Sequence, residues 1–384
     1  MGNGEQHKAL RVLHLFSNCK WTGPAEPALN LCVALRTTGV EADFACAPDA
    51  GDSINMVVET ARDRDIEPVL DLHLKKHHNP IRNWQDRATL KKILQRTPYD
   101  LIHCHLNNDH AIAAPVAKAL GIPLIRMSYE GDGLEVNPRN RKLLESTDYL
   151  IQPAQVALDA DAKNFNFPTD KMCVVPGAID TERFDPQREV PDGRKWLKIP
   201  HDAFVVGIVA RMQTHRRYED LFDALHKLIQ QNPNTHLIVV GRGTNQEKVG
   251  FQPVRNLGLE DNVHFTGYIS GENYVGMLKA LDAGIYLVPG SDGTCRAVRE
   301  ILAMGKPVVA ADRGMLREIV DHEKTGYIFD GHAQGLFEAL NKLMQDRVHL
   351  RDMSRAARDT AQERYSLDAQ AKAVMAVYAQ ILSD

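Results

Sequence analysis

Short apolar runs alternate with amphipathic stretches along most of this chain. The runs are rich in Val, Ile and Leu, which is typical of strands buried on both faces of a parallel sheet. In the first half of the chain they lie at 10–16, 42–47, 101–103 and 124–127. In the second half they lie at 205–209, 236–240, 263–266, 283–287 and 308–311. The amphipathic stretches between them predict helices, among them 27–37, 111–120, 218–231 and 274–281.

Strands that alternate with helices predict parallel sheets with crossover helices, here in two series. Each series is long enough for one doubly wound, Rossmann-like unit. A Pro- and Gly-containing segment at 174–186, followed by the polar stretch 187–194, separates the two series. The fold class is therefore α/β, with an N-terminal domain at 1–178 and a C-terminal domain at 179–365. In such sheets ligands bind beyond the carboxyl ends of the strands, so two facing units would form a central cleft.

Composition narrows the class of protein. Of the 384 residues, 43% are hydrophobic and 25% are charged, as in soluble globular proteins. The net charge of −4 argues against a nucleic-acid partner. The six cysteines form no CxxC pair, which indicates free thiols in a reducing cytoplasm. No apolar run approaches the roughly 20 residues of a membrane span.

The segment 292–310 combines a Gly turn, a short helix and a buried strand. Thr294 is the expected N-cap of the helix, Gly305 its left-handed C-terminal cap, and Pro307 prevents its continuation. Asp292 lies just before the helix and Glu300 within it, so two carboxylates flank free helix N–H groups. This combination suits a ligand with both hydroxyls and phosphates. The alternative is a simple ion pair between Glu300 and Arg296 on a solvated helix face.

Two arginines follow the strand at 205–209. Arg211 stands at its carboxyl end and Arg216 precedes the next helix. Guanidinium groups bind phosphate oxygens by bidentate hydrogen bonds, so this pair could neutralise a diphosphate. A solvated basic turn would look the same. The next strand ends in Gly241-Arg242-Gly243, which is weak evidence because the chain contains no GxGxxG or Walker-type loop.

Taken together, these segments resemble the retaining glycosyltransferases of family 4, which have the GT-B fold. The stretch 292–310 resembles the Glu-x7-Glu motif of that family and its continuation, and 175–184 resembles its interdomain linker. Gly314, Glu318 and 325–327 match the segment that follows the motif, and 22–26 resembles the Gly-Gly loop near the donor diphosphate. The resemblance covers nearly the whole chain. In relatives the last helix returns to the first domain, so we expect 366–384 to do the same.

The resemblance implies a role for each of these residues. Glu300 would bind the ribose hydroxyls of a nucleotide sugar, and Asp292 would orient the transferring sugar. Arg211 and Arg216 would stabilise the departing diphosphate. Further donor contacts are implied at Gly23, Gly267, Tyr268, Ile269, Gly293, Thr294 and Cys295. The resemblance implies no metal and no cofactor, because cationic side chains and a helix terminus replace the ion.

The chain departs from the family pattern at the reaction centre. The first motif acid is Asp292 rather than Glu, and Arg217 replaces the usual Gly after the basic ligand. After the strand at 124–127, Tyr129 stands where many relatives carry a sugar-contacting His, and Glu130 follows it; we assign both to the acceptor side. His105, after the preceding strand, is an alternative catalytic residue, although a lone strand-end His is often structural. His103 shares its strand face, but Cys104 points away, so His-Cys-His is a poor metal site.

The resulting hypothesis is transfer of a hexose-type sugar from a UDP- or GDP-sugar to a hydroxyl acceptor. Cell-envelope polysaccharide, lipopolysaccharide or glycolipid synthesis would supply that acceptor. A GT-B phosphorylase or epimerase is an alternative, and so is a non-catalytic nucleotide-sugar-binding protein. Cytoplasmic localisation follows from the composition.

The segment 73–96 is basic and amphipathic. It carries seven Lys and Arg residues against Asp86, with Ile81, Trp84, Leu90 and Ile93 interleaved. Such a helix could lie on an anionic membrane at its inner face. An ordinary solvated helix packed on its sheet explains the same pattern.

Overall fold

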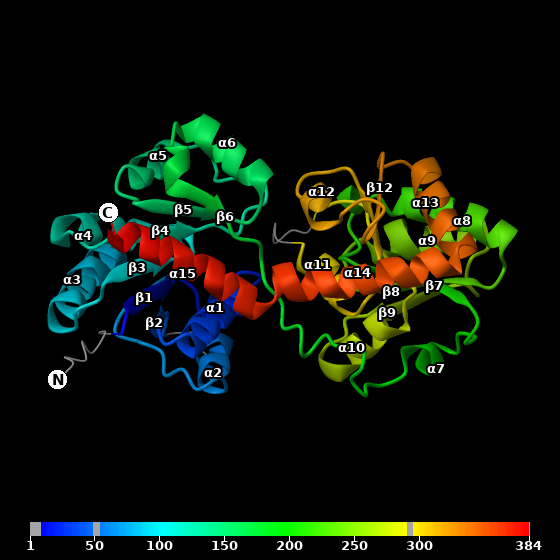
Figure 1. The fold of residues 1–384 in the computed structure, drawn as a ribbon, viewed down its shortest axis with the longest axis horizontal. Coiled ribbons are helices and arrows are strands. Elements are labelled where there is room, and N and C mark those ends of the chain that lie inside the picture. Colours follow the sequence, from blue (N-terminus) through cyan, green and yellow to red (C-terminus); the bar gives the residue numbers. More distant parts are fainter. Residues whose placement is uncertain (1–8, 49–53, 290–294, 384) are drawn as a thin grey trace, which may run out of the picture. The chain divides into compact units, whose positions relative to one another are not determined.

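The computed structural model describes residues 9–48, 54–289 and 295–383. The chain forms two compact units, which Figure 1 shows as ribbons. Unit 1 comprises Met1–Gly177 together with Leu367–Asp384, and unit 2 comprises Ala178–Ser366. Each unit has its own parallel sheet and its own core.

Unit 1 is built on a six-stranded sheet in the order β2-β1-β3-β4-β5-β6, with every pair parallel. Its strands are β1 (Arg11–Phe16), β2 (Glu41–Cys46), β3 (Leu101–Cys104), β4 (Leu124–Met127), β5 (Tyr149–Gln152) and β6 (Met172–Val174). The chain order reverses between β1 and β3, so loops from these two strands leave the sheet on either side of one crevice.

Helices cover both faces of this sheet. They are α1 (Ala25–Thr37), α2 (Met56–Arg62), α3 (Pro80–Arg96), α4 (Asn107–Leu120), α5 (Pro138–Leu144), α6 (Gln155–Phe165) and α15 (Leu367–Ser383). Alternate residues of β1 face opposite layers, as the pleat requires. Val12 and Phe16 pack with α1, α2 and α15, whereas Leu13 and Leu15 pack with α3 and α4. The C-terminal helix α15 thus completes the core of unit 1.

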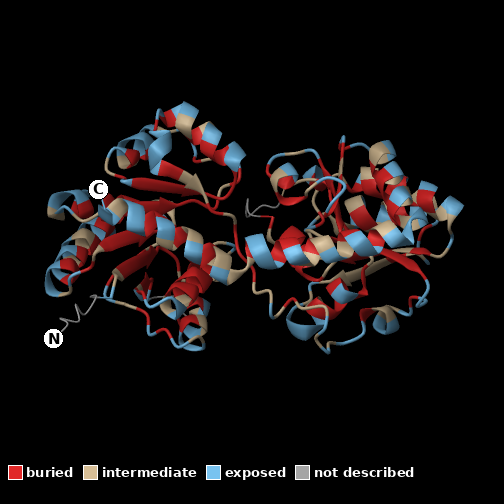
Figure 2. Cartoon of the chain, viewed as in Figure 1, coloured by how far each residue is buried: buried red, intermediate tan, exposed pale blue. Residues whose placement is uncertain are grey.

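Unit 2 repeats this plan with the order β12-β11-β10-β7-β8-β9. Its strands are β7 (Phe204–Val209), β8 (Thr235–Val240), β9 (Val263–Gly267), β10 (Ala283–Tyr286), β11 (Val308–Ala311) and β12 (Gly326–Phe329). Its helices are α7 (Gly193–Leu197), α8 (Tyr218–Gln231), α9 (Gln252–Leu257), α10 (Gly271–Ala280), α11 (Arg296–Ala303), α12 (Leu316–Ile319), α13 (Ala333–Gln345) and α14 (Arg347–Tyr365). In both units most strand residues are buried, although β9 is largely half-buried, whereas the helices turn exposed faces to solvent (Figure 2).

The prediction of two doubly wound parallel sheets is confirmed. Helix α8 and strand β11 have the predicted bounds, because a strong apolar period and a Pro-bounded apolar run mark them. Strands β5, β6 and β12 were not predicted from the sequence. Their three or four residues are defined as strands by parallel pairing with a neighbour in the sheet.

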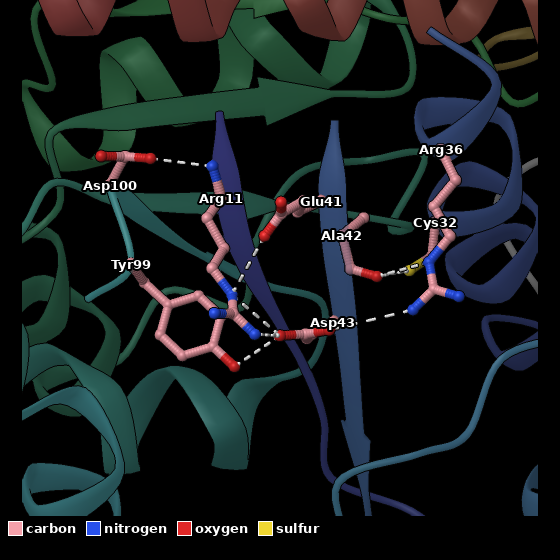
Figure 3. Close-up of polar contacts among 8 residues, drawn as sticks. All are labelled: Arg11, Cys32, Arg36, Glu41, Ala42, Asp43, Tyr99 and Asp100. Atoms are coloured by element: carbon pink, nitrogen blue, oxygen red, sulfur yellow. Dashed lines mark hydrogen bonds and ion pairs between the residues drawn. The ribbon is translucent and has the colours of Figure 1, made fainter. Parts of the chain in front are cut away.

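A polar network ties the amino-terminal ends of β1 and β2 together (Figure 3). Asp43 accepts hydrogen bonds from Arg11 Nη2 at 2.9 Å and from the Tyr99 hydroxyl at 2.7 Å. Arg36 adds an ion pair at 3.8 Å, and the hydrogen bond that Arg11 donates to Asp43 raises the pKa of Arg11. The network lies at the amino-terminal ends of the strands, whereas ligands of such sheets bind beyond the carboxyl ends. We therefore assign it a role in stability.

We expect Asp43→Asn to lower the free energy of unfolding by about 1–3 kcal/mol, because a hydrogen bond to a charged group contributes that much. Urea denaturation monitored in unit 1 measures the change. Glu41→Gln is the matched control. Glu41 is more exposed than Asp43 and lies farther from the Arg11 guanidinium, at 3.7 Å, so this substitution should change the free energy of unfolding by less than about 0.5 kcal/mol. Equal effects of the two substitutions would contradict the assignment.

Candidate functional site

The site in unit 2 begins at the point where the strand order reverses, between β7 and β10. The loop after β7 carries Arg211 and Arg216, and the loop after β10 leads to α11 and Glu300. Carboxyl ends of parallel strands at such a reversal form a ligand crevice. The sheet therefore brings together the two segments that the sequence analysis selected.

A cavity of about 600 Å³ opens at the carboxyl ends of β7, β8 and β9. It is lined by Arg211, Gly241, Arg242, Gly243, Thr244, Gln246 and Tyr268. Two guanidinium groups in a cavity of this size suit an anionic ligand of nucleotide size. Arg211 was predicted for this role, whereas Arg242 was not, because Gly-Arg-Gly alone is a weak signal.

Backbone packing shapes this cavity. A Cβ at Gly243 would lie 2.0 Å from the Met212 carbonyl oxygen, so only glycine permits this approach of two loops. Tyr268 is 72% exposed, and the Arg242 guanidinium lies 5.7 Å from its ring centroid. An exposed aromatic ring beside a cation offers a stacking surface for a planar base. Gly267, with φ of 68°, makes the turn that presents Tyr268, and Ile269 is half-buried after it.

Helix α11 carries Glu300 into a buried position. The helix begins at Arg296, with Cys295 in the left-handed conformation at its N-cap, so Thr294 is one residue too early for the predicted cap. The prediction for Gly305 is confirmed, since its φ is 65° after the last turn. Asp292, Gly293 and Thr294 themselves lie outside the described residues.

Glu300 is 3% exposed and both of its carboxylate oxygens are bonded. The Tyr274 hydroxyl donates to Oε2 at 2.5 Å, and Arg296 Nε donates to Oε1 at 2.6 Å. The alternative ion pair with Arg296 is therefore present, although the carboxylate is buried rather than solvated. Burial and the neighbouring Glu300 charge raise the pKa of Tyr274 well above its usual range. A carboxylate accepts about four hydrogen bonds, so Glu300 retains capacity for ligand hydroxyls.

Arg216 joins the two loops at the strand-order reversal. It is 5% exposed, and its Nη1 donates to the carbonyl oxygens of Val288 at 3.2 Å and Pro289 at 2.7 Å. Its buried Nε has no hydrogen-bond partner among the described residues. Arg216 thus holds the backbone that leads into the Asp292 segment, which the sequence alone did not predict.

In unit 1, three buried histidines stack at the corresponding reversal between β1 and β3. His14, His103 and His105 have ring centroids 4.7–5.3 Å apart, and none of them is exposed. His105 Nε2 is 3.0 Å from His14 Nδ1, and its Nδ1 is 2.7 Å from the Tyr129 hydroxyl. Both ring nitrogens of His105 therefore have partners within the protein. Such contacts are typical of a structural histidine.

The prediction that His103 and His105 share one face and Cys104 lies on the other is confirmed, because the two histidine rings stack on each other whereas Cys104 packs in the core with α3 and α4. The sequence analysis missed His14 and Tyr378. His14 is opposite His103 in the β1–β3 register, and the Tyr378 hydroxyl of α15 is 2.6 Å from His103 Nδ1. Only strand pairing and helix docking bring these distant residues together.

The remaining predicted residues of unit 1 differ in burial, and Tyr129 is part of the core. Gly23 is exposed in the turn before α1, and Glu130 is half-buried in the loop after β4. Tyr129 is 5% exposed. Asp109, which was not predicted, connects the loops after β1 and β3 by accepting from the Ser17 and Leu106 N–H groups.

The buried histidines predict that stability falls on acidification. Burial lowers the pKa of His14 to about 3 and those of His103 and His105 well below the usual 6.5. Above pH 6.5 both folded and unfolded forms are neutral. Below it the unfolded chain binds protons that the folded chain excludes, so each histidine contributes a loss of up to about 1.4 kcal/mol per pH unit.

Thermal unfolding of His14→Gln and the unchanged chain between pH 7 and 5 measures this contribution. Burial raises the pKa of Asp109 to about 7 and of Asp161 to about 6, which opposes the loss, but both acids remain in the variant. The variant should therefore show a shallower dependence on pH. Identical slopes would contradict a neutral, buried His14.

The described residues contain no group of three or more His, Cys, Asp or Glu side chains arranged to hold a metal ion. Within the same residues, no helix is long and apolar enough to cross a membrane.

Family models match both halves of the chain. Residues 190–360 match glycosyl transferases group 1, and residues 23–183 match glycosyltransferase family 4. The chain is 28% identical over 272 residues to D-inositol 3-phosphate glycosyltransferase of Corynebacterium jeikeium, covering 65% of this chain and 64% of that relative. It is 23% identical over 307 residues to N-acetyl-alpha-D-glucosaminyl L-malate synthase of Bacillus anthracis, covering 77% and 79% of the two chains.

Solved structures share the fold. A glycosyltransferase from Rickettsia africae has a TM-score of 0.83 at 16% identity, with 98% of this chain and 100% of that chain covered. HepE from Anabaena in complex with UDP has a TM-score of 0.77 at 19% identity, with 97% and 100% covered.

Proposed function

The chain belongs to the family 4 glycosyltransferases of the GT-B fold, and from that premise we propose that it is a retaining hexosyltransferase. The donor is a UDP- or GDP-sugar and the acceptor is a hydroxyl group of a glycan or glycolipid of the cell envelope. The observation that carries this proposal is the cationic cavity at the carboxyl edge of the unit 2 sheet, with Arg211 and Arg242 in its lining. The UDP complex of HepE and the D-inositol 3-phosphate glycosyltransferases support it by analogy.

In this proposal the donor is bound by a cationic side chain at its diphosphate and by a hydrogen-bond acceptor at its ribose. Arg211 contacts the diphosphate, while Glu300 accepts hydrogen bonds from the ribose hydroxyls. Tyr268 stacks on the base, and Arg216 positions the backbone that carries Asp292. The bond between the anomeric carbon and the diphosphate oxygen breaks with oxocarbenium character, and the acceptor oxygen bonds to the same face of that carbon. The acceptor proton passes to the departing diphosphate, so no protein nucleophile and no metal are required.

Tyr129 is the residue of unit 1 that we place beside the acceptor, with Glu130 next to it. His105 acts as a positioning residue, because its Nδ1 holds the Tyr129 hydroxyl. Loss of His105 should therefore affect transfer through Tyr129 rather than through direct contact with the sugar.

Thermal shifts with UDP-, GDP- and ADP-sugars test the donor assignment, because a ligand that binds the folded state raises its melting temperature. NMR of the product then gives the anomeric configuration, which should match that of the donor. Sugar-1-phosphate turnover or sugar isomerisation without an acceptor would instead indicate a phosphorylase or epimerase. Binding without transfer or hydrolysis would indicate a non-catalytic protein.

We further propose that α3 contacts an anionic membrane. Its residues Ile81 and Trp84 are 71% and 69% exposed, although large apolar side chains are usually buried. Lys91 and Lys92 lie on the exposed side of the same helix. Exposed apolar side chains together with lysines on one helix are the pattern of helices that lie in a bilayer interface.

Substitution of Ile81 and Trp84 by Ser should reduce flotation with phosphatidylglycerol vesicles several-fold, because the apolar contact is lost. The exposed Trp196 of α7 in unit 2 offers a matched control, so Trp196→Ser should leave flotation unchanged. Equal flotation of all three proteins would exclude α3 as the contact.

A further inference from the structure

A second cationic cavity lies in unit 1, away from the histidine stack. It has a volume of about 630 Å³ and is lined by residues of α3, α4 and α5 and of the adjoining loops. Its ionisable lining residues are His78, Arg87, Lys118, Arg139, Lys142 and Glu145. Among the described residues that line it, Glu145 is the only acid.

The cations of this cavity lack acidic partners. Arg87, Lys118, Arg139 and Lys142 form no ion pair within the described part of the chain. Desolvation, with the charge of Arg87 added to it, lowers the pKa of Arg139. Four positive charges around one cavity repel each other, and a bound anion would relieve that repulsion.

The backbone of α4 fixes one of these cations. Pro115 has no N–H, so the carbonyl oxygen of Ala111 lacks its helical hydrogen bond. Arg87 Nη2 donates to that oxygen at 2.9 Å, which anchors the guanidinium across the gap between α3 and α4. The buried Nε of Arg87 has no hydrogen-bond partner in the part of the chain that the structure describes. On the other side, Arg139 Nη2 donates to Asn108 Oδ1 at 3.2 Å. Both guanidinium groups are thus oriented before any ligand binds.

We propose that this cavity binds a phosphate group, carried by an anionic lipid headgroup or free in solution. Oriented guanidinium groups bind phosphate oxygens by charge-assisted hydrogen bonds, and the lysines add charge without a fixed geometry. The exposed Ile81 and Trp84 lie on α3, the helix that also supplies Arg87. The site goes beyond the proposed sugar transfer and does not depend on it.

The test compares the full chain with Lys118→Gln/Lys142→Gln. These lysines are exposed and form neither of the anchoring bonds, so the variant should fold normally. Lys163→Gln/Lys171→Gln removes two exposed lysines of unit 1 outside the cavity and is the matched control. Thermal shifts with inorganic phosphate form one arm, and flotation with phosphatidylglycerol against phosphatidylcholine vesicles forms the other.

We expect the cavity variant to weaken binding by roughly tenfold or more in at least one arm, while the control does not. A loss confined to the phosphate arm identifies a free phosphate ligand, and a loss of flotation identifies a lipid headgroup. If the cavity variant and the control behave alike in both arms, the site does not exist. Thermal shifts with the donor sugar should be the same in all three proteins, which keeps this outcome separate from that of the sugar-transfer proposal.

Discussion

Glu300→Ala is expected to weaken nucleotide-sugar binding by roughly 10²- to 10³-fold. Two hydrogen bonds from ribose hydroxyls to a buried carboxylate contribute about 3–4 kcal/mol together, which corresponds to that factor. Calorimetric titration with the donor sugar measures the dissociation constant. The same substitution also removes the acceptor for Tyr274 and Arg296, so the melting temperature should fall as well.

Two further variants separate the ligand contact from this structural role. Glu300→Gln preserves the volume of the side chain but not its charge, and should lose most of the affinity while remaining folded. Tyr274→Phe removes one hydrogen bond to Glu300 and leaves the carboxylate in place, so donor affinity should fall less than about tenfold. A folded Glu300→Ala with unchanged donor affinity would remove Glu300 from the site.

Arg211→Ala is expected to lower kcat for transfer by roughly 10²- to 10³-fold. The departing diphosphate gains negative charge in the transition state, and one preorganised cationic donor contributes about 3–4 kcal/mol there. Arg211 is exposed in the cavity lining, so the substitution should leave the fold intact. Arg211→Lys should recover part of the rate, because the charge remains but the bidentate geometry does not.

Arg242→Ala is the control within the same cavity. Its guanidinium lies beside the Tyr268 ring, where we expect contact with the base rather than with the breaking bond. It should therefore raise KM with little change in kcat. If both arginine variants lowered kcat alike, the assignment of the diphosphate to Arg211 would be wrong.

Several parts of the molecule could be predicted because local physics determines them. The left-handed Gly305 follows from a helix that must end before Pro307. The position of Arg211 follows from the end of β7, and a strand of five or six apolar residues is visible in the sequence. Cys104 was correctly assigned to the opposite face from His105, because side chains alternate along a strand.

Other parts depend on residues that are distant in the sequence. His14 and His103 are neighbours only because β1 pairs with β3, and Tyr378 reaches them only because α15 packs on the same face. The buried position of His105 could not be inferred from its place at a strand end. Likewise, Arg216 was predicted to bind phosphate, but its contacts with Val288 and Pro289 require β7 and β10 to be adjacent.

By itself the sequence determined the two parallel sheets, the helix that carries Glu300 and the family resemblance of the donor residues. These features arise from apolar periodicity, from Gly and Pro at helix ends, and from motifs within one loop, all of which act over a few residues. The tertiary structure decided which side chains are buried and which polar groups meet: Glu300 with Tyr274, His105 with Tyr129, and Arg87 with the carbonyl freed by Pro115. Those contacts join residues that only strand order and helix packing bring together, and no local pattern encodes them.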